Sequence, residues 1–318
     1  MRIVFAGTPE FAVPSLRALV DAGHEVLGVI TREDAPRGRK RVLTPSPVAA
    51  AAAELRLPVH RANRLDAATT EWVSGLGDGV GPELGVIVAY GGLVREPLLS
   101  LPTLGWINLH FSRLPKWRGA APVQRALMAG EQDLGATVFR LVSALDAGAI
   151  LSESVHAFPP GTPAGAALTD LAALGTEPLL RGIAALEEDP EAGVPQRGEP
   201  SYAHKLERED GRLDLGSSAA RILAHWAGVT PEPGAFALFD DQPLKIRELA
   251  AWEPRPAASP AWGAGAGPDP GTVELIDGRA ILHAADGALE LRQVQPAGKR
   301  AMDGAAWLRG RNGSAVLR

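Results

Sequence analysis

An asparagine and a histidine near the end of one apolar run have side chains that can assist acyl transfer. Asn108 and His110 are two positions apart in the run 105–110, so on a strand both side chains lie on the same face. An amide can donate hydrogen bonds to a developing oxyanion, and an imidazole can also move protons. From the spacing alone, a turn asparagine beside a hydrogen-bonded core histidine remains an open alternative.

A carboxylate in a later glycine-containing loop strengthens the chemical interpretation. The sequence Leu145-Asp146-Ala147-Gly148 follows a predicted strand over 136–142. Asp146 can pair with His110 and raise the pKa of the imidazole, or hold a water that relays protons. The alternative is an ordinary Asp-x-Gly turn, which is a common pattern.

These side chains need a sheet whose strand ends bring them together. Short apolar runs alternate with helical segments through the first half of the chain, which is typical of an α/β domain with a parallel sheet. Ligands bind such sheets beyond the carboxyl ends of the strands, where Asn108 and His110 are expected. The predicted strands are 2–6, 26–30, 84–89, 105–110, 136–142 and 150–157, and the predicted helices are 11–20, 47–55, 120–129 and 164–187.

Chain length and a change in composition indicate two domains. The 318 residues favour two domains at roughly 150 residues each. The stretch 188–200 combines Glu, Asp, Pro and Gly without apolar periodicity, so we expect a linker over 189–205. One helix over 219–227 and several short strands then predict a small β-barrel over 206–318. Within it, the Pro-, Ala- and Gly-rich segment 254–270 is expected to be a mobile loop.

Several classes of protein are excluded or disfavoured by what the sequence lacks. The chain has no cysteine, which excludes thiolate nucleophiles, iron–sulfur clusters and cysteine-based zinc sites. The loop Gly7-Thr8-Pro9-Glu10-Phe11 lacks the later glycines of a dinucleotide fingerprint, and no nucleotide-binding P-loop, nucleophile elbow or His-Glu-x-x-His occurs. Because no apolar run of membrane-spanning length and no signal peptide is found, we expect a cytoplasmic protein without membrane association.

Eight short motifs follow one another along nearly the whole chain. They are Gly7-Thr8-Pro9-Glu10-Phe11-Ala12, Thr44-Pro45-Ser46-Pro47-Val48, Ala89-Tyr90-Gly91, Asn108-x-His110-x-Ser112-x-Leu114-Pro115, Arg118-Gly119-Ala120-Ala121-Pro122-x-Gln124, Leu145-Asp146-x-Gly148, Ser201-Tyr202-Ala203-x-Lys205-Leu206 and Gln295-Pro296-Ala297-Gly298-Lys299. Each is modest support alone, but together and in this order they resemble the methionyl-tRNA formyltransferase family.

The resemblance implies a Rossmann-like formyltransferase domain over 1–188 and an OB-like, tRNA-binding barrel over 206–318. Family members move a formyl group from 10-formyltetrahydrofolate to the α-amino group of methionyl initiator tRNA, without a metal. Carried over by position, the catalytic residues are Asn108, His110 and Asp146, with a protonated His110 and Asn108 stabilising the oxyanion. The residues expected to line the folate pocket are Ala89, Tyr90, Gly91, Ser112, Arg113, Leu114 and Pro115. A monomer is expected.

This chain departs from the family pattern at a few positions. Phe111 and Arg113 replace a glycine and a leucine that usually follow the histidine, which changes the local shape of the expected folate pocket. Val142 stands where the family often carries an aspartate. The expected catalytic residues are all retained.

Charge placement suggests where a polyanion can bind. The net charge is −5, so nucleic acid must be met by local basic patches. Residues 31–41 hold five basic and two acidic side chains, and residues 292–318 hold six basic and one acidic. With the resemblance, these patches predict tRNA contact; a solvated loop and tail are the alternative. The expected tRNA-binding residues are Arg37, Arg39, Lys40, Arg41, Lys299 and Arg300.

Three other functions remain open at this point. A folate-dependent enzyme could formylate an amino sugar, or hydrolyse formyltetrahydrofolate with water as the acceptor. Both would keep Asn108, His110 and Asp146 but would not need the basic segment 31–41. A non-catalytic RNA-binding protein on a decayed enzyme scaffold is the third, and an intact set of catalytic residues argues against it.

Overall fold

The computed structural model describes residues 1–38, 40–253 and 268–318, which form two compact units. The first unit consists of Met1–Pro122, Leu134–His156 and Leu168–Ala203, and the second of Val123–Asp133, Ala157–Ala167 and His204–Arg318. Two short segments from the middle of the chain, 123–133 and 157–167, therefore group with the C-terminal residues. The domain boundaries at 188 and 206 stay a prediction.

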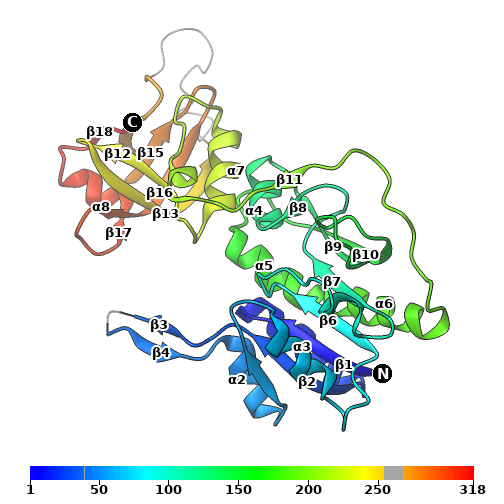
Figure 1. Cartoon of the computed structure of the whole chain (residues 1–318). Helices are drawn as coiled ribbons and strands as arrows, with labels where there is room; N and C mark the ends of the chain where they lie inside the picture. The colour runs from blue at the N-terminus through cyan, green and yellow to red at the C-terminus, as the bar shows by residue number, and fades with distance from the viewer. Residues whose placement is uncertain (39, 254–267) are drawn as a thin grey trace. The chain divides into compact units, whose positions relative to one another are not determined.

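A seven-stranded sheet forms the centre of the first unit, with the strand order β10-β9-β7-β6-β1-β2-β5 (Figure 1). Its strands are β1 (Arg2–Gly7), β2 (Glu25–Thr31), β5 (Val59–Arg61), β6 (Leu84–Val88), β7 (Trp106–His110), β9 (Asp133–Arg140) and β10 (Ile150–Ala157). The pairs from β5 through β7 are parallel, and β9 runs antiparallel to β7. This confirms the predicted parallel-rich α/β fold.

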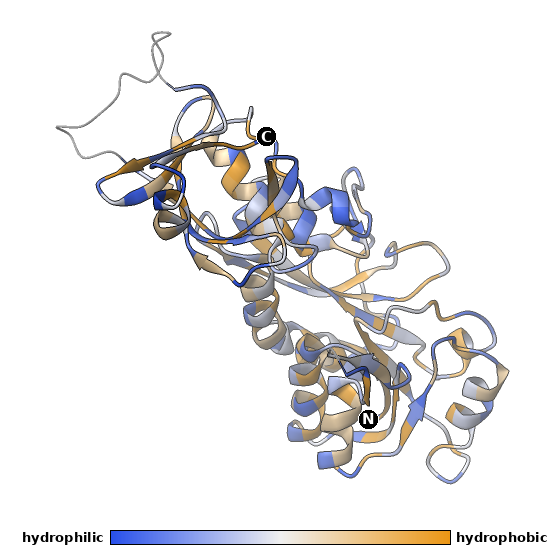
Figure 2. Cartoon of the chain, turned by 90° about the vertical axis from the view of Figure 1, so that its left-hand side faces the viewer, coloured by the Kyte–Doolittle hydropathy of each residue, from blue (hydrophilic) through white to orange (hydrophobic). Residues whose placement is uncertain are grey.

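Continuous burial explains why the sequence forms these strands. Five of the six residues of β1 and all five of β6 are buried, as expected for parallel strands covered on both faces. Figure 2 shows hydrophobic residues concentrated in the strands at the centre of this unit. The apolar runs therefore predicted the strands well, because nearly every side chain in them enters the core.

Helices and short turns connect and cover the strands. The helices are α1 (Val13–Asp21), α2 (Pro47–Glu54), α3 (Ala67–Ser74), α5 (Ala164–Leu174) and α6 (Thr176–Glu188), with 3-10 turns η1 (Glu10–Ala12) and η2 (Leu98–Ser100). The side chains of Ser46 and Asp66 cap α2 and α3 by accepting from Ala49 N and Thr69 N. α3 was not predicted from the sequence.

The single helix predicted over 164–187 is wrong, because the chain breaks it into α5 and α6 at Gly175. A side chain at Gly175 would place its Cβ 2.8 Å from the Leu171 carbonyl oxygen and 3.1 Å from Leu109 Cδ2. The break thus occurs where the backbone passes close to other atoms. Apolar periodicity continues across the break and hides it.

The basic segment 31–41 is expected to be an irregular loop, but its described residues enter a hairpin. β3 (Ala35–Arg37) pairs antiparallel with β4 (Val42–Thr44), and Figure 1 shows the hairpin projecting beside α2. Val42 and Leu43 are 59% and 67% exposed. The hairpin therefore presents apolar as well as basic side chains to solvent.

Most of the predicted linker belongs to the first unit. Residues 189–203, here called the strap, leave the end of α6 and pass β10 to reach β11 (Tyr202–Ala203) (Figure 1). β11 pairs in parallel with β8 (Arg118–Gly119). The strap lacks apolar periodicity because hydrogen bonds, rather than a buried apolar face, attach it to the unit.

The second unit contains an antiparallel sheet in the order β12-β13-β16-β15-β14-β18, with β17 paired to β16. Its elements are α4 (Pro122–Met128), η3 (Arg208–Gly211), α7 (Ala219–Val229), β12 (Phe236–Phe239), β13 (Gln242–Trp252), β14 (Thr272–Ile276), β15 (Arg279–His283), β16 (Ala288–Pro296), β17 (Met302–Asp303), α8 (Gly304–Arg309) and β18 (Ser314–Val316). This confirms the predicted barrel-like C-terminal fold.

The core of the second unit lies between this sheet and its helices. Trp226 of α7 and Trp307 of α8 are buried together with Ile246 and Leu291. Trp226 Nε1 donates to the Ile246 carbonyl at 3.0 Å, so the buried indole is satisfied. The loop expected at 254–270 lies mostly outside the described residues.

Candidate active site

Asn108 and His110 lie at the point where the first unit's sheet changes direction. β7 is parallel to β6 on one side and antiparallel to β9 on the other. His110, the last residue of β7, is buried with 6% exposure, and Asn108 is half-buried. The His110 and Phe139 rings meet in a T-shaped arrangement with 6.4 Å between centroids. The strand therefore presents both polar side chains near its carboxyl end, as predicted.

The hydrogen bonds of His110 fix its tautomer. Its Nε2 lies 2.9 Å from the Trp117 carbonyl oxygen, which can only accept, so Nε2 carries the hydrogen. The other ring nitrogen, Nδ1, lies 3.9 Å from Asp146 Oδ2. In the neutral ring Nδ1 is unprotonated and can accept a proton beside a carboxylate.

Asp146 is brought to His110 by a tightly constrained loop after β9. Its Oδ2 accepts a hydrogen bond from Gly119 N at 2.7 Å, and its side chain is 11% exposed. Its φ of 46° is left-handed, which aspartate tolerates better than most residues. The sequence prediction that Asp146 lies beside His110 thus agrees with the geometry.

Two glycines make this arrangement possible. A Cβ at Gly148 would lie 1.7 Å from the Arg140 carbonyl oxygen, so no side chain fits there. Gly119 has a φ of 122°, and its Cβ would lie 2.8 Å from the Ala203 carbonyl oxygen. Both positions require glycine because the backbone approaches another strand or strap closely.

The net pKa shift of His110 is downward, although Asp146 alone raises the pKa as the sequence predicts. The protonated His110 expected to stabilise the oxyanion stays a prediction. Burial lowers the pKa of His110, while the Asp146 carboxylate and the Trp117 carbonyl raise it without cancelling the effect of burial. The imidazole is therefore neutral at neutral pH. It is better suited to accept a proton than to act as a cation before the reaction begins.

The amide of Asn108 is available to a ligand. In the part of the chain that the structure describes, it makes no hydrogen bond, although the side chain is only half-exposed. A partly buried amide without a partner can donate to a ligand oxygen without first breaking an internal bond. The oxyanion-binding role of Asn108 stays a prediction.

The folate-lining residues predicted after β6 are Ala89, Tyr90 and Gly91. Their main chain, rather than the tyrosine ring, is available to a ligand. Tyr90 is 1% exposed, and its hydroxyl donates to the Ala62 carbonyl at 2.5 Å. Ala89 and Gly91 have positive φ values of 50° and 79°. Arg32 donates to the Tyr90 and Gly91 carbonyls and lies over the Tyr90 ring. Arg32 therefore holds this segment in place.

The residues predicted to line the folate pocket after His110 differ in exposure. Ser112 and Leu114 are buried, and Pro115 is half-buried. Ser112 Oγ donates to the Lys116 carbonyl at 2.7 Å. Arg113 is exposed. A Cβ at Gly135 would lie 2.3 Å from Arg113 Cγ, so the aliphatic part of the arginine side chain packs against that glycine.

The residue that replaces the family glycine after His110 packs in the core. Phe111 is 6% exposed and meets Phe11 edge to face at 5.9 Å between ring centroids. Its ring therefore fills space inside the unit. A substitution that could have disturbed the site is absorbed by packing.

The predicted tRNA-binding residues Lys40 and Arg41 lie at the turn between β3 and β4. Lys40 and Arg41 are exposed there, Arg37 ends β3, and Arg39 lies outside the described residues. The nearby acidic side chains have other partners, since Asp34 pairs with Arg61 at 3.0 Å and Glu33 accepts from Asn63 at 2.7 Å. The positive charge at the turn is therefore not neutralised by these carboxylates.

Lys299 and Arg300 occupy an exposed turn after β16 in the second unit. The turn is closed by Lys299 N donating to the Pro296 carbonyl at 3.0 Å and by Gln295 Nε2 donating to the Lys299 carbonyl at 2.9 Å. One main-chain bond and the Gln295 side chain therefore close the turn, and Lys299 and Arg300 are exposed to solvent. This fits their predicted contact with phosphates.

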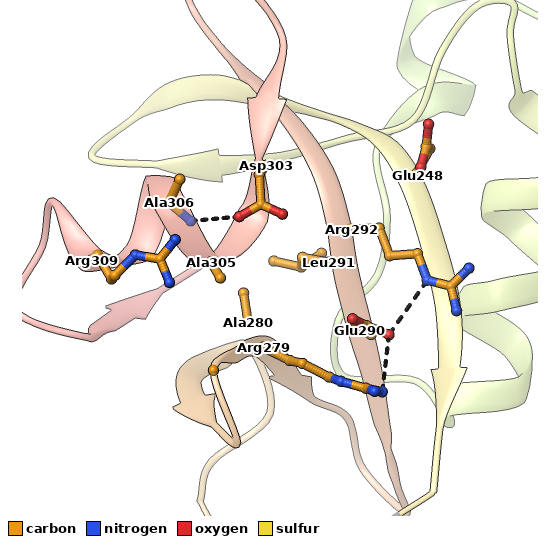
Figure 3. A pocket seen from close by; sticks show the side chains of 11 residues that line it. Glu248, Arg279, Ala280, Glu290, Leu291, Arg292, Asp303, Ala305, Ala306 and Arg309 are labelled. Carbon is orange, nitrogen blue, oxygen red and sulfur yellow. Dashed lines mark hydrogen bonds and ion pairs between the residues drawn. The ribbon is translucent and has the colours of Figure 1, made fainter.

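A hollow of about 670 Å³ lies on the same unit, beside β15, β16 and α8 (Figure 3). Its lining includes three arginines and three carboxylates. Figure 3 shows Glu290 between Arg279 and Arg292, at 3.7 Å and 3.4 Å from their nitrogens. Because the lining charges balance, this hollow is a weaker phosphate site than the turn at Lys299.

Sequence reasoning missed the groups that hold the site together. The Trp117 carbonyl, the Gly119 amide and the Gln196 side chain contact the site or its loop, and the Arg118 side chain holds Gln196. Gly119 belongs to one of the eight motifs, but a motif does not show that a main-chain amide binds Asp146. Gln196 lies in a segment predicted to be a linker. That segment has no apolar periodicity that would indicate an inward-facing side chain.

The described residues contain no group of three or more His, Asp or Glu side chains placed to hold a metal ion. In the same residues, no helix is both long enough and apolar enough to cross a membrane.

Comparison with known proteins gives the class of enzyme that this fold and site define. Residues 1–166 match the formyl transferase family model, and residues 205–312 match the formyl transferase C-terminal domain model. The chain is therefore a formyltransferase, with both domains of the class in the expected order.

Full-length relatives narrow the class. A methionyl-tRNA formyltransferase of Leifsonia xyli subsp. xyli is 54% identical over 319 residues, covering 100% of both chains. One from Clavibacter sepedonicus is 51% identical over 310 residues, covering 98% of this chain and 97% of that protein. The chain belongs to the methionyl-tRNA formyltransferase family.

A solved structure shares the fold across most of the chain. The N-formyltransferase from Helicobacter canadensis, solved with folinic acid and dTDP-3-aminofucose, gives a TM-score of 0.65 at 14% identity. The match covers 92% of this chain and 98% of that one. This likeness supports the fold alone. The acceptor of the formyl group must be inferred from this chain's own residues.

Proposed function

We propose that this enzyme transfers the formyl group of 10-formyltetrahydrofolate to the α-amino group of methionyl initiator tRNA, which prepares that tRNA for translation initiation. The observation that carries the proposal is the position of the unprotonated His110 Nδ1, 3.9 Å from an oxygen of the Asp146 carboxylate. The same strand supplies the unengaged amide of Asn108. These are the groups that acyl transfer to an amine requires.

The reaction needs one proton to move from the attacking amine to the leaving nitrogen. The α-amino nitrogen forms a bond to the formyl carbon while His110 Nδ1 accepts its proton. The bond between the formyl carbon and N10 of the folate then breaks, and the same proton goes to N10. The products are formylmethionyl-tRNA and tetrahydrofolate, and no other reactant is consumed.

Asn108 and Asp146 stabilise the charges that develop during this step. The Asn108 amide donates to the formyl oxygen as it becomes an oxyanion. Asp146 faces Nδ1 and stabilises the imidazolium once the proton arrives. Because His110 is neutral in the free enzyme, its positive charge appears only when the oxyanion does, so the stabilisation favours the transition state over the ground state.

The folate donor is proposed to lie against the segments that flank these residues. Main-chain groups of Ala89, Tyr90 and Gly91 and the residues 112–115 form its walls. The rigid support of 89–91 by Arg32 and Thr8, whose Oγ1 donates to the Tyr90 carbonyl at 3.2 Å, favours a preorganised pocket. No step of the proposed reaction uses a metal.

The tRNA is proposed to contact two basic surfaces. One is the basic segment that contains Arg37, Arg39, Lys40 and Arg41, and the other is the turn at Lys299 and Arg300. In this assignment 1–188 is the catalytic domain, 206–318 binds tRNA and 189–205 connects them. Exposed lysine and arginine side chains gain affinity by releasing counterions from phosphates.

The acceptor is tested by offering the enzyme three acceptors with one labelled donor. 10-Formyltetrahydrofolate labelled in the formyl group is incubated with methionyl-tRNA, with a nucleotide-linked amino sugar, or in buffer alone. The proposal predicts label in acid-precipitable tRNA, with little in the sugar and little released as formate. Label transferred to the sugar, or released as formate as fast as to tRNA, contradicts the proposed acceptor.

A further inference from the structure

We propose that Gln196 of the strap is a positioning residue that fixes the Asp146 carboxylate for the reaction. Its Nε2 donates to the Asp146 carbonyl at 2.8 Å and to the Gly148 carbonyl at 2.9 Å. Its Oε1 accepts from Arg118 Nη2 at 2.6 Å. The inference rests on the function proposed above, because it concerns how that site is held.

The amide of Gln196 is matched to its three partners. Its two N–H groups meet two carbonyl oxygens, and its oxygen meets a guanidinium N–H, so both ends of the amide are used. A carboxylate at this position would keep the bond to Arg118 but would face the two carbonyls with no hydrogen to donate. An asparagine is shorter by one methylene. The chemistry of the position therefore requires a glutamine.

The loop that Gln196 holds carries exposed apolar side chains and a residue in the left-handed region. Val142 and Leu145 are 43% and 51% exposed, and Asp146 itself has a left-handed φ of 46°. Arg140 N donates to the Ala149 carbonyl at 2.9 Å, which closes the base of the loop. The two hydrogen bonds that Gln196 donates are made further along the loop, to the main-chain carbonyls of Asp146 and Gly148.

Gln196 also joins this loop to the strand that binds the Asp146 carboxylate. Arg118 and Gly119 are the two residues of β8. Arg118 donates to Gln196, and Gly119 N donates to Asp146 Oδ2 at 2.7 Å. The main chain and the side chain of Asp146 are thus both tied to β8, which sets the carboxylate at its distance from His110.

The strap is itself anchored on either side of Gln196. Val194 and Ile150 exchange two main-chain hydrogen bonds of 2.8 Å, and Ser201 Oγ accepts from Trp117 N at 2.9 Å. Among residues 193–200, Gln196 is the one that is not exposed. A glutamine turned inward between two anchors acts as a clamp rather than as a solvated linker residue.

The test compares Gln196→Ala and Gln196→Glu with the wild type, and uses the exposed neighbour Arg197→Ala as the matched control. Misplacing a reacting group by about 1 Å can cost on the order of 100-fold in rate, so we expect kcat for formyl transfer to fall about 10- to 100-fold in both Gln196 variants. KM for both substrates should stay within about twofold, and Arg197→Ala should behave like the wild type.

A second readout follows His110 by NMR in the free protein. In Gln196→Ala the attraction of Asp146 weakens, so the pKa of His110 should fall below its wild-type value. A kcat within twofold of the wild type overturns the inference. A reduced kcat with an unchanged His110 titration also overturns it, because it shows a general structural role. If the wild type itself formylates no tRNA, the proposed function fails, while the NMR comparison still decides the role of Gln196.

Discussion

His110 has two ring nitrogens with different and fixed tasks. Nε2 is held by the Trp117 carbonyl at 2.9 Å, whereas Nδ1 faces a carboxylate oxygen at 3.9 Å. Burial keeps the ring neutral, and Asp146 makes protonation at Nδ1 less costly than burial alone would allow. The residue is therefore built to receive a proton and then release it.

Asp146→Asn should lower the pKa of His110 further below its ordinary value of 6.5. The asparagine oxygen can still accept from Gly119 N, but the attraction that favours the imidazolium is lost. We expect kcat to fall by about 100-fold or more, as for a lost proton-transfer partner. His110 titration by NMR and steady-state kinetics measure the two effects.

The exposed Asp170→Asn serves as the control for Asp146→Asn, since it removes the same charge elsewhere. It should leave both quantities unchanged. An unaltered His110 pKa in Asp146→Asn would show that the carboxylate does not act on the ring.

Among the elements, the strands could be predicted well and the connections could not. β1 and β6 are nearly continuous apolar runs because almost every side chain in them enters the core, and in β7 the apolar residues are interrupted by Asn108 and His110. The strap and β8 are held by main-chain bonds and by a few polar side chains such as Gln196. Those bonds join residues about 50 to 80 positions apart, and nothing in local composition indicates them.

The candidate site, like the fold, could be predicted only in part from the sequence. Asn108 and His110 follow from strand alternation, and Asp146 follows from its glycine-containing loop. The sign of the His110 pKa shift does not, because it depends on how deeply the ring is buried and only a folded structure shows that. Burial outweighs the neighbouring carboxylate here.

Gly148→Ala should displace the loop that carries Asp146. Its Cβ would lie 1.7 Å from the Arg140 carbonyl oxygen, so the backbone must move. We expect a loss of about 1–3 kcal/mol in unfolding free energy, typical of overpacking, together with a large fall in kcat. Chemical denaturation and kinetics test this against Gly216→Ala, whose Cβ would lie at an ordinary 3.4 Å from Asp214 Oδ1. Equal behaviour of the two variants would contradict the steric argument.

Over the whole molecule, a net charge of −5 conceals two local basic surfaces. Exposed Lys40 and Arg41 lie in the first unit, and exposed Lys299 and Arg300 in the second. The acidic average keeps the protein from binding polyanions indiscriminately, whereas the two surfaces supply local attraction. Binding of tRNA should therefore depend strongly on salt.

Removing Lys40 and Arg41 together should weaken tRNA binding and reduce its salt dependence. For each phosphate that the variant no longer neutralises, the slope of log K against log salt should become shallower by about 0.7–0.9. Affinity for the folate donor should not change, because the donor is proposed to lie elsewhere. Filter binding over a salt series measures the slope, and Arg56→Ala removes one exposed charge as the control. A slope equal to that of the wild type would refute the contribution of the hairpin.

The site on β7 is proposed to perform formyl transfer to methionyl-tRNA, and the single-turnover rate of Asn108→Ala tests this most directly. The experiment mixes saturating enzyme with labelled 10-formyltetrahydrofolate and methionyl-tRNA and follows formylated tRNA with time. The wild type should react, and the variant should be slower by about 100- to 1,000-fold, as for a lost oxyanion donor, with both substrates bound as tightly as before. A variant that formylates tRNA at nearly the wild-type rate would contradict the claim.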